Sequence, residues 1–353
     1  MSKMFRELIH RSRRISRDEF ALTFGGVAED VIDMLQSEQA RQATKEARDI
    51  METCPPLASG MARLRQAEFG LFSSAPELER GEVVAIDGTP TLPLQIYSAG
   101  QALCVGVASI SYRRPMQDSL HYWSSKAFLA DAKDTDDYIA RQEQGLFGIS
   151  PTAYLRYYEA KHAVDDLKEP YVLFDGTLIY EWLVGLTEGV ELYEKLLKEK
   201  KCIGIIKNIR TDTVITTFAR AMRTGEIFFV ETLAQHLDGN NAANKNVGES
   251  AKRGVLPKFK RTSERIWRGL FKPAKKVFAF EVHEEHLEDM LRILVADCQL
   301  NNIGHEIPYL LNRIDEEVRT NFNARILQNR ISAQMATESE ELFFEETNER
   351  QLR

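Results

Sequence analysis

The chain contains the sequence Glu82-Val-Val-Ala-Ile-Asp87-Gly-Thr89, an apolar run that stops abruptly at Asp-Gly. A short apolar run with a turn signal at its end is typical of a strand that is buried on both faces of a sheet. The same ending recurs in Tyr171-Val-Leu-Phe-Asp175-Gly-Thr177, and we find no other internal repeat. The two stretches therefore predict two buried strands, each ending in an acid.

The segments around these two strands alternate between strand and helix patterns. Further strands are expected at 94–110, 202–207, 226–230 and 276–282, and helices at 151–167, 212–222, 283–298 and 307–332. Another helical stretch is expected between the second strand and residue 201. Strands that alternate with helices predict an α/β fold, with a mixed central sheet flanked by helices.

The same patterns predict three regions along the chain. Residues 1–75 are expected to form an N-terminal helical region, with helix from about 20 to 72 broken at Pro55 and Pro56. Residues 76–335 are expected to form the α/β domain, in which a Gly/Asn-rich and then basic segment, 237–276, is mobile. Residues 336–353 are expected to be an acidic tail.

The composition is that of a globular protein with a substantial core, since 43% of the 353 residues are hydrophobic and 28% are charged. No apolar run reaches the roughly 18 residues of a membrane-spanning helix, and the basic N-terminus lacks the apolar segment of a secretory signal. The four cysteines form no Cys-x-x-Cys pair, which argues against a zinc ribbon and a disulfide framework. We therefore expect a cytoplasmic protein.

The formal net charge of −7 gives no overall attraction for nucleic acid, but the charges are unevenly placed. Basic residues dominate 252–276, where only Glu264 opposes them and two aromatic residues could stack on bases. This stretch is either a DNA contact or a solvated basic loop. The basic residues at 11–17 could contact DNA or a partner protein, or could form a flexible solvated tail. The residues expected to bind DNA are Lys252, Arg253, Lys258, Lys260, Arg261, Arg265 and Arg268.

The two strand-end acids, Asp87 and Asp175, would lie close together if their strands are neighbours. Like charges a few ångströms apart are unfavourable unless one takes a proton or a divalent cation lies between them. Carboxylate oxygens suit magnesium or manganese, and paired ions of this kind stabilise the attacking and leaving oxygens of phosphodiester hydrolysis. A single Asp-Gly is most often only a turn, but two copies that each close an apolar strand favour a metal site.

Three further residues are candidates for the same site. Glu159 lies on the helix before the second strand, on a face expected to pack against the sheet, although it could instead pair with a basic neighbour in solvent. Asp315 lies on the last helix beside other acids and could be surface charge. Lys207 ends the third apolar strand, where it either neutralises a scissile phosphate or only reaches solvent.

In their order along the chain, these elements resemble the NurA nuclease family, partners of HerA-type hexameric translocases. The resemblance rests on Ala-Ile-Asp87-Gly-Thr, helical Glu159, Phe-Asp175-Gly-Thr-Leu-Ile, Ile-Ile-Lys207 and Pro308-Tyr309-x-Leu311-x-x-x-Asp315, and it spans about 83–315. The chain has Thr where many family members have Ser after Asp-Gly. The last position is His in some members and an acid in others.

The resemblance implies an RNase H-like nuclease that uses Mn²⁺ (or Mg²⁺) to degrade DNA ends and single strands. It implies catalytic roles for Asp87, Glu159, Asp175, Lys207 and Asp315, and metal binding by the four acids among them. It also implies a homodimer that docks on a HerA-like hexameric ATPase, in DNA repair or in defence against foreign DNA. The chain itself has no G-x-x-x-x-G-K-[ST] phosphate loop, so ATP-driven movement would come from that partner.

Two other functions remain open from the sequence. Asp-Gly-Thr after a first strand also occurs in actin-like and sugar-kinase-like ATPases, but here the Pro-rich 89–93 offers no cluster of free backbone amides for phosphate. A non-catalytic DNA-binding or scaffold subunit would depend on the basic stretch, and its acids would be incidental. Metal-dependent cleavage distinguishes the two.

Overall fold

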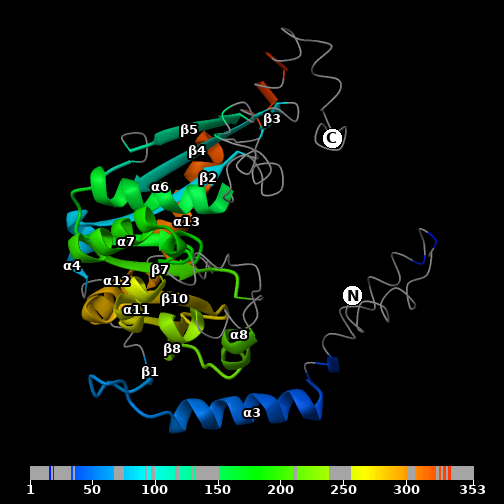
Figure 1. The fold of residues 1–353 in the computed structure, drawn as a ribbon. Helices are drawn as coiled ribbons and strands as arrows, with labels where there is room; N and C mark the ends of the chain where they lie inside the picture. Colours follow the sequence, from blue (N-terminus) through cyan, green and yellow to red (C-terminus); the bar gives the residue numbers. More distant parts are fainter. Residues whose placement is uncertain are drawn as a thin grey trace.

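The computed structural model describes residues 36–66, 75–91, 94–96, 100–115, 119–128, 151–209, 213–237, 256–299 and 307–322, with a few isolated positions. In these ranges one mixed sheet runs through the molecule in the order β1-β8-β9-β10-β7-β6-β2-β4-β3, with β5 added beside β4 (Figure 1). The strands are β1 (Leu64–Gln66), β2 (Val83–Pro90), β3 (Leu94–Ile96), β4 (Gly100–Ile110), β5 (His121–Phe128), β6 (Tyr171–Asp175), β7 (Lys201–Ile206), β8 (Glu226–Thr232), β9 (Ile266–Phe271) and β10 (Phe278–His283).

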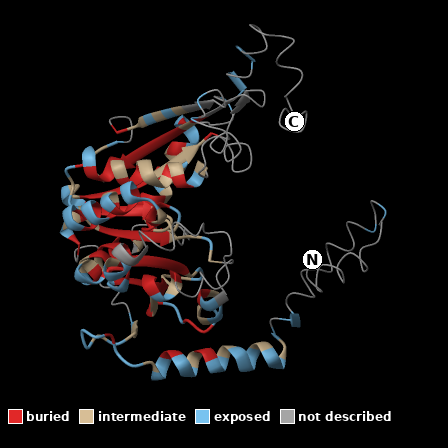
Figure 2. Ribbon diagram, viewed as in Figure 1, coloured by how far each residue is buried: buried red, intermediate tan, exposed pale blue. Residues whose placement is uncertain are grey.

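Helices cover both faces of this sheet, so that the strands are buried and the outer helix faces are exposed (Figure 2). The helices are α3 (Glu38–Thr53), α4 (Pro76–Arg80), α6 (Pro151–Asp165), η5 (Leu183–Gly185), α7 (Thr187–Glu199), α8 (Thr213–Ala219), α11 (Leu256–Glu264), η6 (Glu284–His286), α12 (Leu287–Gln299) and α13 (Tyr309–Asn321). The expected α/β fold with a mixed, helix-flanked sheet is confirmed.

The strands that position the candidate site are β4, β2, β6 and β7. β2 pairs with β4 in antiparallel register and with β6 in parallel register, and β6 pairs in parallel with β7. An antiparallel β2-β4-β5 meander followed by parallel β6 and β7 is the arrangement expected of an RNase H-like core. Parallel strands point the same way, so β2, β6 and β7 reach one edge of the sheet together.

Side-chain alternation assigns each residue of these strands to one of two cores. Val84 and Ile86 lie in the cluster that packs with α6 and α7, whereas Val83 and Ala85 lie in the cluster that packs with α12 and α13. Each of these four side chains is fully buried, which stabilises the fold by roughly 1.5–3 kcal/mol for a valine or isoleucine. Because alternate residues share a face, Asp87 continues the series that faces α13.

The N-terminal part of the chain is not helical throughout. α3 forms as expected, with the Ser37 hydroxyl accepting from the Ala40 amide at 3.2 Å to cap its first turn. Residues 64–66, however, form β1, which pairs antiparallel with β8, where helix was expected. The expectation was wrong there because a three-residue strand is defined by its pairing partner, and three residues are too few to show a period.

The expectation of a mobile segment over 237–276 is wrong for its second half. Residues 256–264 form α11, and residues 266–271 form β9, a fully buried strand between β8 and β10. The basic residues concealed a short, largely apolar strand that pairs on both sides. Residues 238–255 and the acidic tail 336–353 lie outside the described ranges, and the expected helix at 307–332 is described as α13 over its first half.

No helix in the described part of the chain is both long enough and apolar enough to cross a lipid bilayer.

Candidate active site

Three carboxylates meet at the edge of the sheet where the parallel strands end. Asp87 of β2, Asp175 of β6 and Asp315 of α13 each place an oxygen within 4.8 Å of the others, and all three are partly buried. The parallel register aligns Ile86 with Phe174, so the next residue of each strand is at the same level. Helix α13 packs against β2 and brings the third acid from elsewhere in the chain.

Asp87 does not end its strand, in contrast to the expectation from the Asp-Gly pair. β2 continues to Pro90, and Asp87 to Pro90 remain paired with β4. The parallel pairing of β2 with β6 stops at Ile86. Asp87 is therefore held rigidly on one side by β4, while its other side opens toward Asp175.

The electrostatics of the group oppose ionisation of all its acids. Burial and the nearby charges of Asp175 and Glu159 hold the pKa of Asp87 well above its usual range. Burial also raises the pKa of Asp175, although Lys207 and Arg156 act in the opposite direction. Carboxylates in such surroundings share a proton or bind a cation.

Lys207 follows β7 and forms an ion pair with the Asp175 carboxylate through its Nζ atom. Its side chain is only 19% exposed, so it does not simply extend into solvent. The ion pair fixes the ammonium group next to the acidic group. From there it can neutralise negative charge on a bound phosphate.

Glu159 of α6 lies beside the three aspartates but outside their group. It is 1% exposed, and its Oε2 atom accepts from the Arg156 guanidinium at 2.6 Å. Burial raises the pKa of Glu159, and Arg156 lowers it. Its Oε1 atom is buried and has no hydrogen-bond partner of ordinary geometry among the described residues, although the Gly88 amide is near enough to lower the pKa. A buried carboxylate oxygen without a full partner is free to accept a cation.

Arg156 links Glu159 of α6 to the end of β6 at Asp175, and the sequence did not reveal this link. Its guanidinium donates to the Glu159 carboxylate and, at 2.7 Å, to the backbone carbonyl of Asp175. Residue 176 has a φ of +128°, and a Cβ atom there would lie 2.2 Å from Arg156 Nη2. Glycine is therefore favoured at position 176 for two reasons. Its φ is positive, and the Arg156 side chain lies where a Cβ atom would be. The only signal in the sequence was the i,i+3 spacing of Arg156 and Glu159.

The donor set fits a hard divalent cation. Asp87, Asp175 and Asp315 offer carboxylate oxygens from three elements, and Glu159 offers a fourth from the opposite face of the sheet. Oxygen-only sites suit Mg²⁺, Ca²⁺ or Mn²⁺, whereas Zn²⁺ and Cu²⁺ favour nitrogen or sulfur ligands. The structure thus brings together four of the five residues expected at the site, counting Lys207, and places Glu159 beside them.

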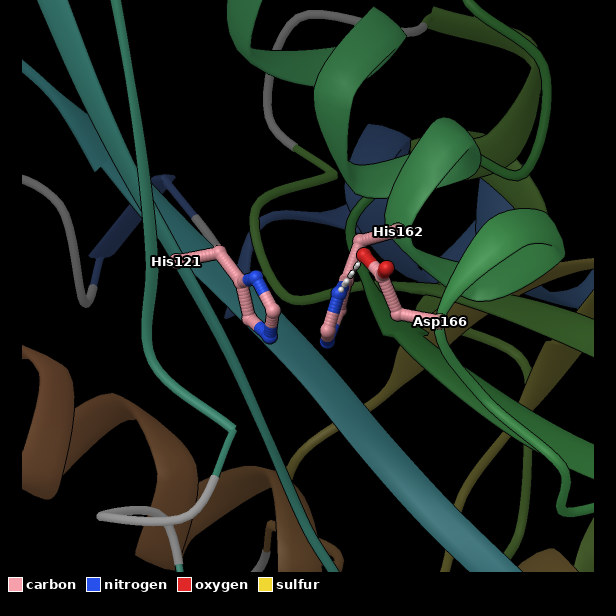
Figure 3. A group of neighbouring side chains, drawn as sticks. All are labelled: His121, His162 and Asp166. Atoms are coloured by element: carbon pink, nitrogen blue, oxygen red, sulfur yellow. Dashed lines mark hydrogen bonds and ion pairs between the residues drawn. The ribbon is translucent and has the colours of Figure 1, made fainter.

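A second group of possible ligands, His121, His162 and Asp166, lies between β5 and α6 (Figure 3). His162 is fully buried, and both of its ring nitrogens have protein partners, with Asp166 at 2.9 Å and the Ser109 hydroxyl at 3.2 Å. The bond to Ser109 ties α6 to β4 one turn after Glu159. The group is therefore explained as an anchor for the helix that carries Glu159.

His283 is buried at the end of β10, where its Nδ1 atom accepts from the Glu285 amide and caps η6.

The residues expected to bind DNA lie in different surroundings. Lys260 and Arg261 are exposed on α11, and Arg265 is half-exposed but pairs with Glu284 and Glu285. Arg268 is 4% exposed and pairs with Glu231 and Glu281 across the sheet, so its assignment to a DNA surface was wrong. Both faces of β9 are covered, so the Arg268 side chain lies inside the molecule. Lys252 and Arg253, and the side chain of Lys258, lie outside the described part of the chain.

Converging carboxylates at the ends of parallel strands, with a lysine beside them, define the class of α/β nucleases. The sequence profile of the NurA domain matches residues 81–320, which include all five candidate residues. The chain belongs to the NurA family.

Solved structures give matches of low identity. The chain is similar to the NurA nuclease from Sulfolobus solfataricus, with 14% identity over 72% of this chain and 84% of that chain and a TM-score of 0.42. It is also similar to a NurA bound to dAMP and manganese, with 10% identity, coverage of 85% and 94%, and a TM-score of 0.47. For the catalytic domain of human endonuclease V the identity is 14%, the coverage 82% and 99%, and the TM-score 0.29. No curated protein sequence matches the chain.

Proposed function

We propose that this NurA-family chain hydrolyses phosphodiester bonds at DNA ends and in single strands, with Mn²⁺ (or Mg²⁺) as its cofactor. The observation that carries the proposal is the approach of Asp87, Asp175 and Asp315 to within 4.8 Å through one oxygen each. Such a group is electrostatically unfavourable in the protein alone and becomes favourable around a divalent ion. A bound ion would supply Lewis-acid polarisation of the scissile phosphate.

The side chains of this site have distinct parts in the proposal. Asp87, Asp175 and Asp315 hold the cofactor, and Glu159 completes the oxygen set from the face of α6. Lys207 neutralises charge on the phosphate from its place beside Asp175. Arg156 touches no substrate and acts by positioning Glu159 and the Asp175 backbone.

The proposal includes partners that rest on the family resemblance. A NurA-like chain is expected to form a homodimer and to receive DNA from a HerA-like hexameric ATPase. The absence of a phosphate loop from this sequence supports an external motor. The role is then DNA end processing in repair or defence against foreign DNA.

The test is digestion of end-labelled linear and single-stranded DNA by the purified chain in Mn²⁺, in Mg²⁺ and in EDTA, with and without a HerA-type ATPase. We expect cleavage in Mn²⁺ and none in EDTA. Asp175→Asn should abolish cleavage, whereas the matched control Asp165→Asn, an exposed acid paired with Lys161, should cleave normally. Cleavage that persists in EDTA or in Asp175→Asn would contradict the proposal.

The two rival functions have outcomes of their own in the same experiment. DNA binding with no cleavage in any metal would favour the scaffold subunit. Saturable binding of labelled ATP to the chain alone would favour an actin-like or sugar-kinase-like ATPase. The Pro-rich segment 89–93 opposes that second function, because it offers no cluster of free backbone amides for a nucleotide phosphate.

A further inference from the structure

A cleft of about 600 Å³ opens beside the carboxylate group. It is lined by residues that follow β7, by the C-terminal half of α8 and by the segment that precedes β10. These segments meet because β10 runs antiparallel to β7, with Ala279 opposite Ile206, so that residues just before β10 lie beside residues just after β7 (Figure 1). The volume is too large for a single ion and lies in the range of sites that hold a small organic molecule, about 300–1,000 Å³.

The cleft is continuous with the candidate active site through one residue. Lys207 lines the cleft and also pairs with the Asp175 carboxylate. A phosphate held at the carboxylate group would therefore have the cleft directly beside it. A substrate that extends from this phosphate past Lys207 would reach the cleft.

The described lining of the cleft is positively charged, with Lys207, Arg220 and Lys276 and no acid. Arg220 and Lys276 are exposed, and neither pairs with an acid in the described ranges, unlike Arg265 and Arg268 nearby. Lys276 Nζ lies 5.1 Å from the centre of the Phe278 ring, a cation–π contact that restrains the side chain. These two charges thus lie at the cleft without being neutralised by an acid of the described residues.

Apolar side chains complete the lining. Ile209, Ala219 and Val277 also line the cleft. Cations together with apolar surface suit a nucleic-acid backbone, whose phosphates are charged and whose sugars offer carbon-rich surface. Contacts to phosphate position a strand without selecting its sequence.

We propose that this cleft, lined by Lys207, Arg220 and Lys276, holds the sugar–phosphate backbone of a DNA strand next to the scissile phosphate. The inference rests on the proposed function, because it takes DNA as the substrate. It adds the path of the DNA strand, which runs from the carboxylate group past Lys207 and then between α8 and the start of β10. It also replaces Arg268, which is buried, with Arg220 and Lys276 as basic residues that contact the substrate.

The test measures binding of a fluorescent single strand of about twelve nucleotides to the full chain in EDTA, over a range of salt concentrations. Arg220→Ala and Lys276→Ala should each weaken binding about threefold to tenfold and lower the slope of log affinity against log salt by about 0.7. The matched controls are Arg223→Ala and Lys275→Ala, which remove exposed charges close in sequence that do not line the cleft. Both controls should bind as the wild type does.

Three results would overturn the inference. Unchanged binding by both cleft variants would remove the cleft as a phosphate site, and equal losses in the cleft and control variants would indicate an unspecific basic surface. If the two cleft variants weakened binding of the DNA strand and of free deoxyadenosine monophosphate by the same factor, the cleft would be assigned to a single nucleotide. Wild-type Mn²⁺-dependent cleavage, measured separately, decides the proposed function, so the two can fail independently.

Discussion

At the scale of single residues, the site combines groups that destabilise one another in the protein alone. Burial is the main cause that raises the pKa of Asp87, and the charges of Asp175 and Glu159 add to it. Lys207 and Arg156 only partly offset this charge, because Lys207 acts mainly on Asp175 and Arg156 mainly on Glu159. A residue held in this way contributes to function at a cost to stability.

Asp87→Asn should therefore separate function from stability. We expect DNA cleavage to fall by at least about 10³-fold, because one oxygen ligand is lost. In EDTA the variant should be at least as stable as the wild type, since a repelling charge is removed. In Mn²⁺ the wild-type melting temperature should rise and that of the variant should rise less. Calorimetric melting curves with and without Mn²⁺ test this, and a large loss of stability in EDTA would contradict it.

A second residue-scale prediction concerns Gly176. Gly176→Ala should lower the free energy of unfolding by at least about 1 kcal/mol and reduce cleavage, because the added Cβ meets Arg156 and the backbone is left-handed. Gly60→Ala is the matched control, since its φ is +84° but nothing lies within 4 Å of the added atom. Denaturant unfolding of both variants separates backbone strain from the clash. Equal losses would mean that Arg156 yields without cost.

At the scale of elements, the strand β10 fixes the loop that follows Asp175. Glu281 of β10 is 2% exposed and accepts from the backbone amides of Leu178 at 3.0 Å and Ile179 at 3.3 Å. It also accepts from the buried Arg268 at 3.2 Å. A strand two positions away in the sheet thus determines the backbone geometry just beyond Asp175.

Glu281→Ala should be strongly destabilising, by about 3–5 kcal/mol, because it leaves the Arg268 guanidinium buried with one partner fewer and two amides unpaired. Glu288→Ala is the control, because its ion pair with Arg65 involves a carboxylate that is 63% exposed and should contribute at most about 1 kcal/mol. Chemical denaturation of the two variants gives the comparison. Similar losses would show that the buried pair is not structural.

The free energy of unfolding should depend on pH through His236, which bridges Glu181 and Glu231. Burial alone would lower the pKa of His236, but the two carboxylates outweigh it and raise the pKa to about 9. Because the folded pKa lies above the unfolded value of about 6.5, the stabilisation is complete below pH 6.5 and is lost as the pH rises through 9. The wild type should lose on the order of 2 kcal/mol over this window, less than the full shift implies because Glu181 is partly exposed.

The variant His236→Gln isolates this contribution. Its unfolding free energy, measured at intervals from pH 6 to about pH 9.5, should change less with pH than that of the wild type. A pH dependence identical to that of the wild type would assign the loss to other groups.

At the scale of the whole molecule, the site depends on segments far apart in the chain. Asp87 and Asp315 are separated by most of the domain, and Arg220 and Lys276 join Lys207 only because β10 lies beside β7. The order of strands in the sheet thus brings the acids to one edge and places the cleft with Lys207, Arg220 and Lys276 next to them. A DNA strand that passed from the acids into the cleft would contact the segment after β7, helix α8 and the segment before β10.

The sequence by itself determined the alternation of strands and helices, the two acids that follow apolar runs, and the family. These features are local, because apolar periodicity and turn residues are written within a few positions of each other. Tertiary structure alone decided that Asp87 lies inside β2, that Arg268 is buried and that Arg156 bridges Glu159 to Asp175. It also decided that Arg220 and Lys276 share a cleft. Each of these depends on strand register and on contacts between distant segments, which no local pattern encodes.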